Sequence, residues 1–439
     1  MIRVSIIGAT GYAGAELLRL LYNHPQVQVV HITSESYTGK KISEVYPHLR
    51  GLYDQELISM KDMDTIANDS DFVFIGLPHG HAMEVGKALA DTNVRIIDLG
   101  ADYRFDDTDI YEAWYKVAHT HKDAPRVYGL AELYREDIKN AKIIGNAGCY
   151  TTASILALAP LVKNEFIEPN TIIVDAKSGT SGSGRSAKQM THYPELYDNF
   201  KAYGVATHRH TPEIEQALGH LCHRKVTLNF TPHLVPMSRG ILSTCYANIK
   251  QWVTPEMIDK AYTDMYGDEY FIRLLGRGAY PSTKEVRGSN FCDIGWHIDL
   301  RTGRIIVLSA IDNLVKGAAG QAIQNFNIAC GFDEKTGLDF TPIYPWYFDN
   351  SEVYFMIKKD TQGVTFAKGF TAAGVKDGIK KSGNLDVAVI YTKTQAVVAG
   401  TFTQNKVAAA PVYVSKEVVA TGTAHAIVAN AGCANACTG

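Results

Sequence analysis

The sequence predicts an α/β chain that begins with a parallel sheet and continues into a mixed α+β domain. An apolar strand-like run at 4–7 leads through a glycine-rich turn into helical periodicity at 15–21. Two further buried runs, at 72–75 and 94–98, end in turn residues, which is typical of parallel strands joined by helices. After residue 150, strand-like runs alternate with polar loops. The length of 439 residues leaves room for two or three domains.

The turn after the first strand has the sequence GATGYAG, with glycines at Gly8, Gly11 and Gly14. Glycines let the backbone turn tightly and approach a pyrophosphate, whose charge then lies at the N-terminus of the next helix. The spacing G-x-x-G-x-x-G departs from the usual G-x-G-x-x-G. Its place between a strand and a helix nevertheless predicts a Rossmann-type dinucleotide-binding domain, with Thr10 and Tyr12 in the cofactor site.

The second strand-like run, 27–33, indicates which dinucleotide is bound. An NAD site usually has a carboxylate at the end of this strand to hold the ribose 2′-OH. Here the first polar residues are hydroxyls, with Ser34 and Ser36 assigned to the site, and Lys40 and Lys41 follow closely. This pattern favours NADP(H).

Composition and charge narrow the class of protein. The chain has 43 basic and 46 acidic residues, so nothing indicates binding to nucleic acid or to an anionic membrane. No apolar run is long enough for a membrane helix, and the N-terminus lacks a signal-peptide pattern, so we expect a cytoplasmic enzyme of small molecules. The seven cysteines are too sparse for a disulfide framework. Cys433 and Cys437 lack the further ligands of a zinc site, and no metal is predicted.

Cys149 lies in the stretch GNAGCYTT, between a strand-like run and a helical one. A cysteine at a helix N-terminus is favoured as a thiolate, which is the nucleophilic form. Free cysteines are also among the most buried residues, and most are inert. The position alone therefore leaves both a nucleophile and a buried thiol open.

Two polar motifs follow in the α+β region. KSGTSGSGR, at 177–185, offers successive backbone N–H groups and two cations to an anion, although a flexible linker has the same composition. HRHTPEIEQ, at 208–216, contains two histidines, and a histidine brought to a cysteine by the fold would form an activated nucleophile. Arg104 follows the strand pattern 94–98, where a surface ion pair is the alternative.

Nine motifs, taken in order, resemble the N-acetyl-gamma-glutamyl-phosphate reductase family of arginine biosynthesis, which is related to aspartate-semialdehyde dehydrogenase. They run from residue 1 to about 345 and are GATGYAG, GLPHG, LGADYRF, VYGLAEL, GNAGCYTT, KSGTSGSGR, HRHTPEIEQ, PMSRGI and DNLVKGAAGQA. One departure is Ala147, where the family usually has proline. The resemblance implies a dinucleotide-binding domain plus a substrate domain of the semialdehyde dehydrogenase type. An aspartate-semialdehyde dehydrogenase is the alternative within this fold.

The resemblance implies that the Cys149 thiolate attacks an acyl phosphate and that the resulting thioester accepts hydride from NADPH. His210 is assigned as the acid and base, with His208 as the alternative. Arg104, Arg185 and Arg239 would bind phosphate or carboxylate, and Glu213 would orient a histidine or the amide. Cofactor contacts are also assigned to Ser178, Gly179 and Asn313. A homo-oligomer, either a dimer or a tetramer, is expected.

The predicted boundaries are 1–148 with 313–345 for the NADP-binding domain, 149–312 for the catalytic domain, 346–355 for a linker and 356–439 for a tail. The tail resembles the N-terminal part of glutamate N-acetyltransferase, with the family's Thr-Gly pair at 438–439 and Cys433 in place of asparagine. The threonine nucleophile lies beyond this stretch, so acetyltransferase activity is not expected. The sequence favours two adjacent genes joined by a frameshift or an error of gene prediction over a genuine bifunctional fusion, because Met356 begins a plausible N-terminus.

Overall fold

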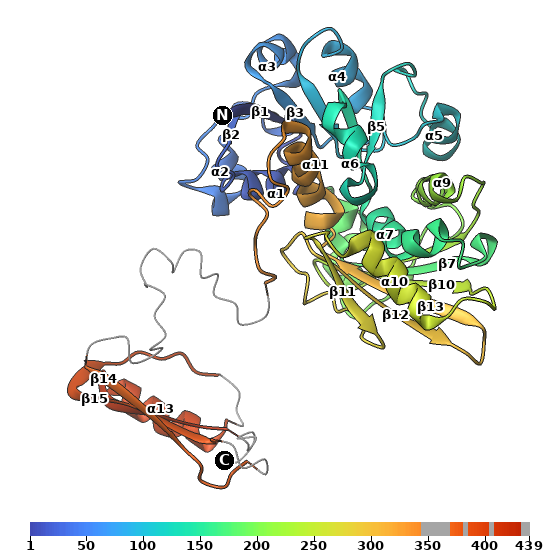
Figure 1. Cartoon of the computed structure of the whole chain (residues 1–439). Coiled ribbons are helices and arrows are strands. Elements are labelled where there is room, and N and C mark those ends of the chain that lie inside the picture. Colours follow the sequence, from blue (N-terminus) through green and yellow to red (C-terminus); the bar gives the residue numbers. More distant parts are fainter. Residues whose placement is uncertain (344–368, 381–384, 404–407, 432–439) are drawn as a thin grey trace. The chain divides into compact units, whose positions relative to one another are not determined.

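The computed structural model describes residues 1–343, 369–380, 385–403 and 408–431 (Figure 1). The chain divides into two compact units, Met1–Tyr347 and Phe348–Gly439. Each unit is described below by itself. No helix of the described residues is long and apolar enough to cross a membrane.

The first sheet of the larger unit has six parallel strands in the order β2-β1-β3-β4-β6-β5. Its strands are β1 (Ile2–Ile7), β2 (Val27–Ile32), β3 (Phe72–Ile75), β4 (Arg95–Asp98), β5 (Arg126–Gly129) and β6 (Ile143–Asn146). The strand order reverses between β1 and β3, and in open parallel sheets such a switch point is where ligands bind. The predicted α/β class and the Rossmann-type topology are confirmed.

Helices cover both faces of this sheet (Figure 1). They are α1 (Tyr12–Leu21), α2 (Ile42–Val45), α3 (Met63–Asp69), α4 (Ala82–Ala88), α5 (Thr108–Tyr115), α6 (Ala131–Asn140) and, from the far end of the unit, α11 (Gly320–Cys330). Phe326 of α11 packs edge-on against Phe72 of β3, with ring centroids 5.0 Å apart. The chain therefore returns to complete the first core after building the second domain.

The second sheet has seven strands in the order β11-β12-β13-β10-β7-β9-β8, with both parallel and antiparallel pairs. Its strands are β7 (Ile173–Ser178), β8 (Lys201–Ala202), β9 (Asn229–Leu234), β10 (Ile241–Asn248), β11 (Ile272–Arg277), β12 (Cys292–Asp299) and β13 (Arg304–Ile311). Burial alternates along β7 and most of β13, so one face of the sheet packs on the core.

That buried face is covered by α7 (Cys149–Lys163), α9 (Thr211–Cys222) and α10 (Pro255–Tyr266), as Figure 1 shows for α7 and α10. Helix α7 is apolar on all sides, and residues 150–162 are all buried. A helix of this kind needs packing partners around its whole circumference. The short helix α8 (Tyr193–Leu196) also belongs to the second domain, and the π-helical turn η7 (Val315–Ala319) leads from β13 back to α11 and the first core.

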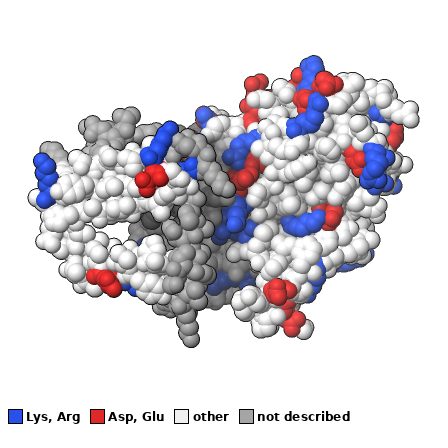
Figure 2. Space-filling model, turned by 90° about the horizontal axis from the view of Figure 1, so that it is seen from below, with Lys and Arg blue, Asp and Glu red and all other residues white. Residues whose placement is uncertain are grey.

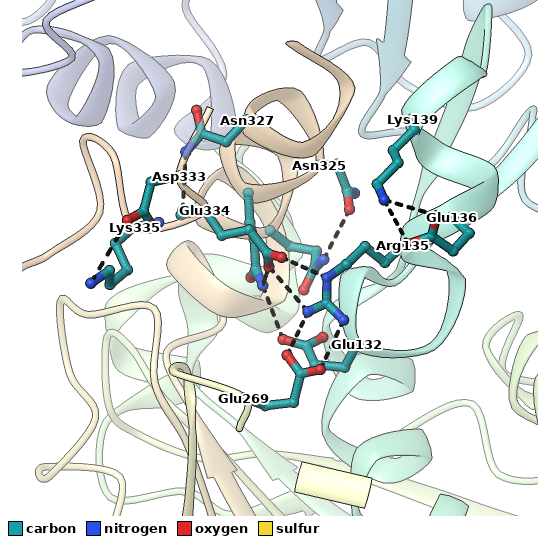
Figure 3. Close-up of polar contacts among 12 residues, drawn as sticks. Glu132, Arg135, Glu136, Lys139, Glu269, Asn325, Asn327, Asp333, Glu334 and Lys335 are labelled. Carbon is teal, nitrogen blue, oxygen red and sulfur yellow. Dashed lines mark hydrogen bonds and ion pairs between the residues drawn. The ribbon is translucent and has the colours of Figure 1, made fainter. Parts of the chain in front are cut away.

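A charged network joins α6, the segment before β11 and the segment after α11 (Figure 3). Arg135 donates to both carboxylate oxygens of Glu269, at 2.9 and 2.6 Å, and to Glu334 at 2.6 Å. Deeper in the molecule, the fully buried Lys316 ammonium pairs with the carboxylate of Glu132. The Arg135–Glu269 pair links the first domain to the second, whereas the buried Lys316–Glu132 pair fixes η7 against α6, where removing one partner would be costly.

The smaller unit contains a three-stranded antiparallel sheet in the order β14-β15-β16 and the helix α13 (Ala410–Ala420). The strands are β14 (Phe370–Val375), β15 (Val387–Val397) and β16 (Thr423–Asn430). Most side chains of these elements are exposed, among them Val397 at 90 % and Val428 at 68 %.

Figure 2 shows both signs of charge interspersed over the described surface that is turned to the viewer.

Candidate active site

A cavity of about 550 Å³ lies between the carboxyl edge of the first sheet and the second domain. The first domain contributes the loops after β3 and β4, including Pro78, His79 and Arg104. The second domain contributes Cys149 and the loop after β7. Residues that are up to 157 positions apart in sequence, Leu77 and Leu234, therefore line one space, and both predicted motifs of the α+β region reach it.

Cys149 is the first residue of α7 and is partly buried in this cavity wall. Burial raises the pKa of its thiol to about 11, although the Tyr150 backbone N–H and the Arg104 charge act in the opposite direction. The expected position at a helix N-terminus is confirmed. The expected preference for the thiolate is not found, because burial outweighs the helix terminus, so the protonated thiol is the favoured form at neutral pH.

The turn around Cys149 is packed so closely that two glycines are required. A Cβ on Gly148 would lie 2.6 Å from His210 Nε2, and a Cβ on Gly317 would lie 2.7 Å from Cys149 Cβ. Ala147, which replaces the usual proline, uses its N–H to donate to the Gly129 carbonyl oxygen at 3.3 Å. A proline at position 147 would fix φ but has no N–H to donate. Alanine therefore adds one hydrogen bond to this turn and leaves φ unrestrained.

Both predicted histidines line the cavity, with ring centroids 4.8 Å apart. His208 Nδ1 accepts from the His210 backbone N–H at 3.2 Å, so the neutral His208 ring carries its proton on Nε2. His210 Nδ1 is buried without a hydrogen-bond partner among the described residues. Burial is the first cause that lowers the pKa of both groups, to about 2 for His208 and well below 6.5 for His210, where Arg104 and Arg209 add to it. Both rings are therefore neutral.

Glu213, fully buried at the start of α9, holds the turn before Cys149. One carboxylate oxygen accepts from the Gly148 backbone N–H at 2.8 Å, from Tyr128 Oη at 2.8 Å and from Thr151 Oγ1 at 2.9 Å. The other oxygen accepts from Arg104 Nη1 at 3.2 Å. Both oxygens of Glu213 are thus bonded to the protein itself.

Arg104 lines the cavity but is only 7 % exposed. Besides Glu213, its guanidinium donates to the carbonyl oxygens of Asn146 at 2.7 Å and Leu99 at 2.9 Å. Of these three acceptors only Glu213 belongs to the second domain, so Arg104 is anchored in its own domain and links it to the other through Glu213.

Two cations that line the cavity were missed by sequence reasoning. Arg209 lies over the ring of Tyr115, with Cζ 5.1 Å from the centroid, and its Nη1 is 2.6 Å from His79 Nε2. Lys188 lies on the loop beyond KSGTSGSGR. Arg209 stands between the two predicted histidines in the HRH motif, which was the available signal.

Arg239 and Arg185 do not line this cavity. The Arg239 guanidinium donates to both oxygens of Glu16 on α1, at 3.0 and 2.6 Å. Burial alone would raise the pKa of Glu16, but Arg239 and Arg19 more than offset it and lower that pKa to about 2. Arg185 Nη1 donates to the Thr10 carbonyl oxygen at 3.1 Å, beside the glycine turn.

The glycine turn has the geometry that a dinucleotide site needs. Gly8 has a φ of +84°, and a Cβ there would lie 2.7 Å from the carbonyl oxygen of Gly76, across the β1/β3 switch point. A Cβ on Gly14 would lie 2.6 Å from Ala9 Cα. Gly11 caps α1, and Thr10 Oγ1 lies 2.8 Å from Ser34 Oγ at the end of β2. Tyr12 and Ser36 are exposed at this same edge, so the residues present fit a dinucleotide phosphate.

Ser178 and Gly179 line the cavity at the end of β7. Asn313 connects the loop after β7 to the loop before β10. Its Nδ2 donates to Ser181 Oγ at 2.9 Å, and its Oδ1 accepts from the Gly240 N–H at 2.7 Å. Asn313 therefore positions the loop at the side where the predicted nicotinamide would lie.

No group of three or more His, Cys, Asp or Glu side chains in the described part of the chain is arranged to hold a metal ion. The pair Cys433 and Cys437 lies outside the described residues.

Family models match three parts of the chain. Residues 3–141 match "Semialdehyde dehydrogenase, NAD binding domain" and residues 149–313 match "Semialdehyde dehydrogenase, dimerisation domain". Residues 371–439 match the ArgJ family, which supports the predicted acetyltransferase fragment. Fold and site together define the class of the larger unit: it is a nucleotide-binding oxidoreductase of the semialdehyde dehydrogenase type.

Comparison with similar proteins identifies a particular family within this class. The chain is 54 % identical over 347 residues to N-acetyl-gamma-glutamyl-phosphate reductase of Desulforamulus reducens, covering 79 % of this chain and 100 % of that one. It is 53 % identical to the same enzyme of Pelotomaculum thermopropionicum, covering 78 % of this chain and 99 % of the relative. The chain belongs to the N-acetyl-gamma-glutamyl-phosphate reductase family of arginine biosynthesis, and the predicted resemblance is confirmed.

Solved structures show the same fold. Aspartate semialdehyde dehydrogenase II of Vibrio cholerae superposes with a TM-score of 0.58 at 18 % identity, covering 75 % of this chain and 99 % of that one. The enzyme of Candida albicans, solved with NADP, gives 0.57 at 17 % identity, covering 75 % and 99 %.

Proposed function

We propose that the larger unit reduces N-acetyl-gamma-glutamyl phosphate to N-acetyl-L-glutamate 5-semialdehyde and phosphate, with Cys149 as the nucleophile and NADPH as the reductant. The observation that carries the proposal is that one cavity is lined by the first residue of α7, by two neutral histidines and by the loops after β3 and β4 of the first sheet. The high identity to reductases over the whole of their length supports this substrate over aspartyl phosphate.

The Cys149 thiol attacks the acyl carbonyl carbon, a C–S bond forms, and the C–O bond to phosphate breaks. Because burial raises the thiol pKa to about 11, its proton must leave as the C–S bond forms. We assign His210 as the acceptor. It is neutral, its Nε2 lies against Gly148, and its Nδ1 is without a partner among the described residues.

The reduced dinucleotide, when bound, supplies the hydride that converts the thioester into a thiohemiacetal. His210 returns its proton to the developing oxyanion, then takes the hydroxyl proton back as the C–S bond breaks, and delivers it to the Cys149 sulfur. The aldehyde leaves and the free thiol is restored. His208 keeps the role of alternative acid and base.

The two anionic groups of the substrate require cations. Arg209 and Lys188 line the cavity, and we propose that they hold the phosphate and the α-carboxylate. We assign Arg104, through Glu213, to positioning of the Cys149 turn. Arg239 we assign to the link between α1 and the loop at 236–240.

The glycine turn and its surroundings would hold the cofactor. We propose that Gly8, Gly11 and Gly14 accommodate the pyrophosphate, that Thr10, Ser34 and the exposed Ser36 bind the adenosine ribose, and that Ser178, Gly179 and Asn313 lie at the nicotinamide side. The hydroxyls at the end of β2 favour NADP over NAD.

We propose the domain boundaries 1–148 with 313–345 and 149–312, because α11 packs in the first core. The match to a dimerisation domain supports a homo-oligomer, either a dimer or a tetramer. A catalytic free thiol needs a reducing compartment, which for a biosynthetic reductase is the cytoplasm.

The test measures the reverse reaction, the phosphate-dependent reduction of NADP⁺, with N-acetylglutamate 5-semialdehyde and with aspartate semialdehyde. We expect kcat/KM for the first to exceed that for the second by a factor of at least about 10³, since the site must hold the N-acetyl group. Equal values, or a preference for aspartate semialdehyde, would overturn the proposed substrate. Omitting phosphate should abolish the reaction.

A further inference from the structure

The end of β2 has hydroxyl groups but no available carboxylate. Ser34 Oγ pairs with Thr10 Oγ1 at 2.8 Å. Glu35 is the first carboxylate after the strand, and its Oε1 accepts from the Met60 backbone N–H at 2.6 Å and from Ser59 Oγ at 3.2 Å. Glu35 therefore caps the turn at 59–62. Its carboxylate is engaged away from the ribose position.

A cation from the other domain reaches this place. Arg185 ends the loop that follows β7, and its Nη1 donates to the carbonyl oxygen of Thr10 at 3.1 Å. The guanidinium lies over two tyrosine rings, with Cζ 4.8 Å from the centroid of Tyr46 and 5.3 Å from that of Tyr37. Tyr46 Oη also donates to the Thr10 carbonyl, at 3.0 Å. These contacts hold the guanidinium of an otherwise exposed side chain beside the glycine turn.

The stacked guanidinium is suited to a phosphate. Guanidinium has five N–H donors in a fixed fork, and one of them is bonded to Thr10. The Tyr46 hydroxyl also interacts with this guanidinium, so only part of the five-donor fork is engaged. Lys40 contacts the same ring, with Nζ 5.8 Å from the centroid of Tyr37. Arg185 thus lies beside Thr10, whose hydroxyl pairs with that of Ser34, and Lys40 shares the Tyr37 ring with Arg185. The carboxylate of Glu35, which would repel a phosphate, is engaged with Met60 and Ser59.

We propose that Arg185 binds the ribose 2′-phosphate of NADP(H) from across the domain boundary and is the main determinant of the preference for NADP. This inference rests on the proposed cofactor. It replaces the sequence-based assignment of Arg185 to the substrate, because Arg185 lies at Thr10 and Tyr46 and does not line the cavity of Cys149. The same loop lines that cavity at Ser178 and Gly179, so one segment would contact both the adenosine end of the cofactor and the reaction site.

The experiment measures binding by titration calorimetry on the full chain. The probes are 2′,5′-ADP, which carries the 2′-phosphate without a nicotinamide, and 5′-AMP, which lacks it. We expect Arg185→Ala to raise the Kd of 2′,5′-ADP by about 10- to 100-fold, the usual range for loss of a charge-assisted pair, and to leave that of 5′-AMP within about twofold. Arg185→Lys should recover part of the loss. Arg301→Ala, at a side chain that is 83 % exposed on the β12–β13 turn, is the matched control and should change neither Kd.

The outcomes separate the two proposals. If the unaltered chain binds 2′,5′-ADP no more tightly than 5′-AMP, the proposed NADP preference fails and the role of Arg185 fails with it. If the unaltered chain prefers 2′,5′-ADP and Arg185→Ala keeps that preference, only the role of Arg185 is overturned. Melting temperatures of the variants, measured in parallel, show whether a loss of binding reflects loss of the fold.

Discussion

The carboxylate of Glu213 lies 2.8 Å from the backbone nitrogen of Gly148, the residue that precedes the proposed nucleophile. Glu213 is 65 positions away in sequence and comes from a different helix. Its carboxylate also accepts hydrogen bonds from Tyr128 Oη and Arg104 Nη1. A buried carboxylate with four donors fixes the geometry of a turn more firmly than the turn residues can.

Glu213→Gln should lower kcat by about 10- to 100-fold, with little change in KM. The amide keeps the shape but loses the charge that pairs with Arg104, so the Cys149 turn shifts by a fraction of an ångström. Steady-state kinetics and the melting temperature are measured together. Tyr128→Phe, which removes one donor and no charge, is the matched variant and should have a smaller effect. A change confined to KM would contradict a positioning role.

Cys149→Ser should abolish turnover while leaving the Kd of NADPH within about twofold. A serine hydroxyl is a far weaker nucleophile than a thiolate at neutral pH. Mass spectrometry after addition of the acyl phosphate should detect an acyl adduct on the unaltered chain and none on the variant. Retention of more than a few per cent of kcat would remove Cys149 from the mechanism.

His210→Asn should lower kcat by about 10² to 10⁴, the usual contribution of general acid and base catalysis. His208→Asn should have a smaller effect, because His208 Nδ1 already accepts the His210 backbone N–H and supports that residue. The kcat values of the two variants are compared at several pH values in the phosphate-dependent reverse reaction. The larger loss in the His208 variant would exchange the two assignments.

Glu16→Gln should destabilise the fold at pH 6 and much less at pH 3. The folded pKa of about 2 lies below the usual 4.5, so the stabilisation is fully present above pH 4.5 and is lost as the pH falls through about 2. The difference from the unaltered chain should be about 3 kcal/mol at pH 6 and about half of that or less at pH 3. Urea unfolding checks this, with Glu136→Gln, whose side chain is 78 % exposed, as control. An equal difference at both pH values would show that the Glu16 pairs with Arg239 and Arg19 do not stabilise the fold.

A chain shortened to residues 1–345 should keep kcat/KM within about twofold, because every residue that lines the cavity lies between positions 77 and 234. It should also aggregate less. The removed strands expose apolar side chains such as Val397 and Ile427, and exposed strands of this kind pair with other chains. Light scattering at equal concentration measures the second effect. A large loss of activity would show that the tail is part of the reductase.

The sequence by itself determined the class and the family. A strand, a glycine turn and a helix are local patterns, so the periodicity of residues 4–21 was enough to predict them. The ordered motifs around Cys149 and His210 identified the reductase. The tail sequence also contains strand-like runs at 387–391 and 426–428, and these lie within β15 and β16.

The tertiary structure decided which arginine side chains are free to bind a ligand and which are paired within the protein. Arg104, Arg185 and Arg239 look alike in sequence, but a guanidinium pairs with whichever acceptor the fold brings to it. The Arg239 guanidinium pairs with the carboxylate of Glu16, and that of Arg104 pairs with Glu213. Arg185 instead donates a hydrogen bond to the Thr10 carbonyl oxygen. Burial likewise raised the pKa of the Cys149 thiol against the effect of its helix, because desolvation depends on every residue packed around the sulfur. Partners and burial arise from contacts that are distant in sequence, so no local pattern could specify them.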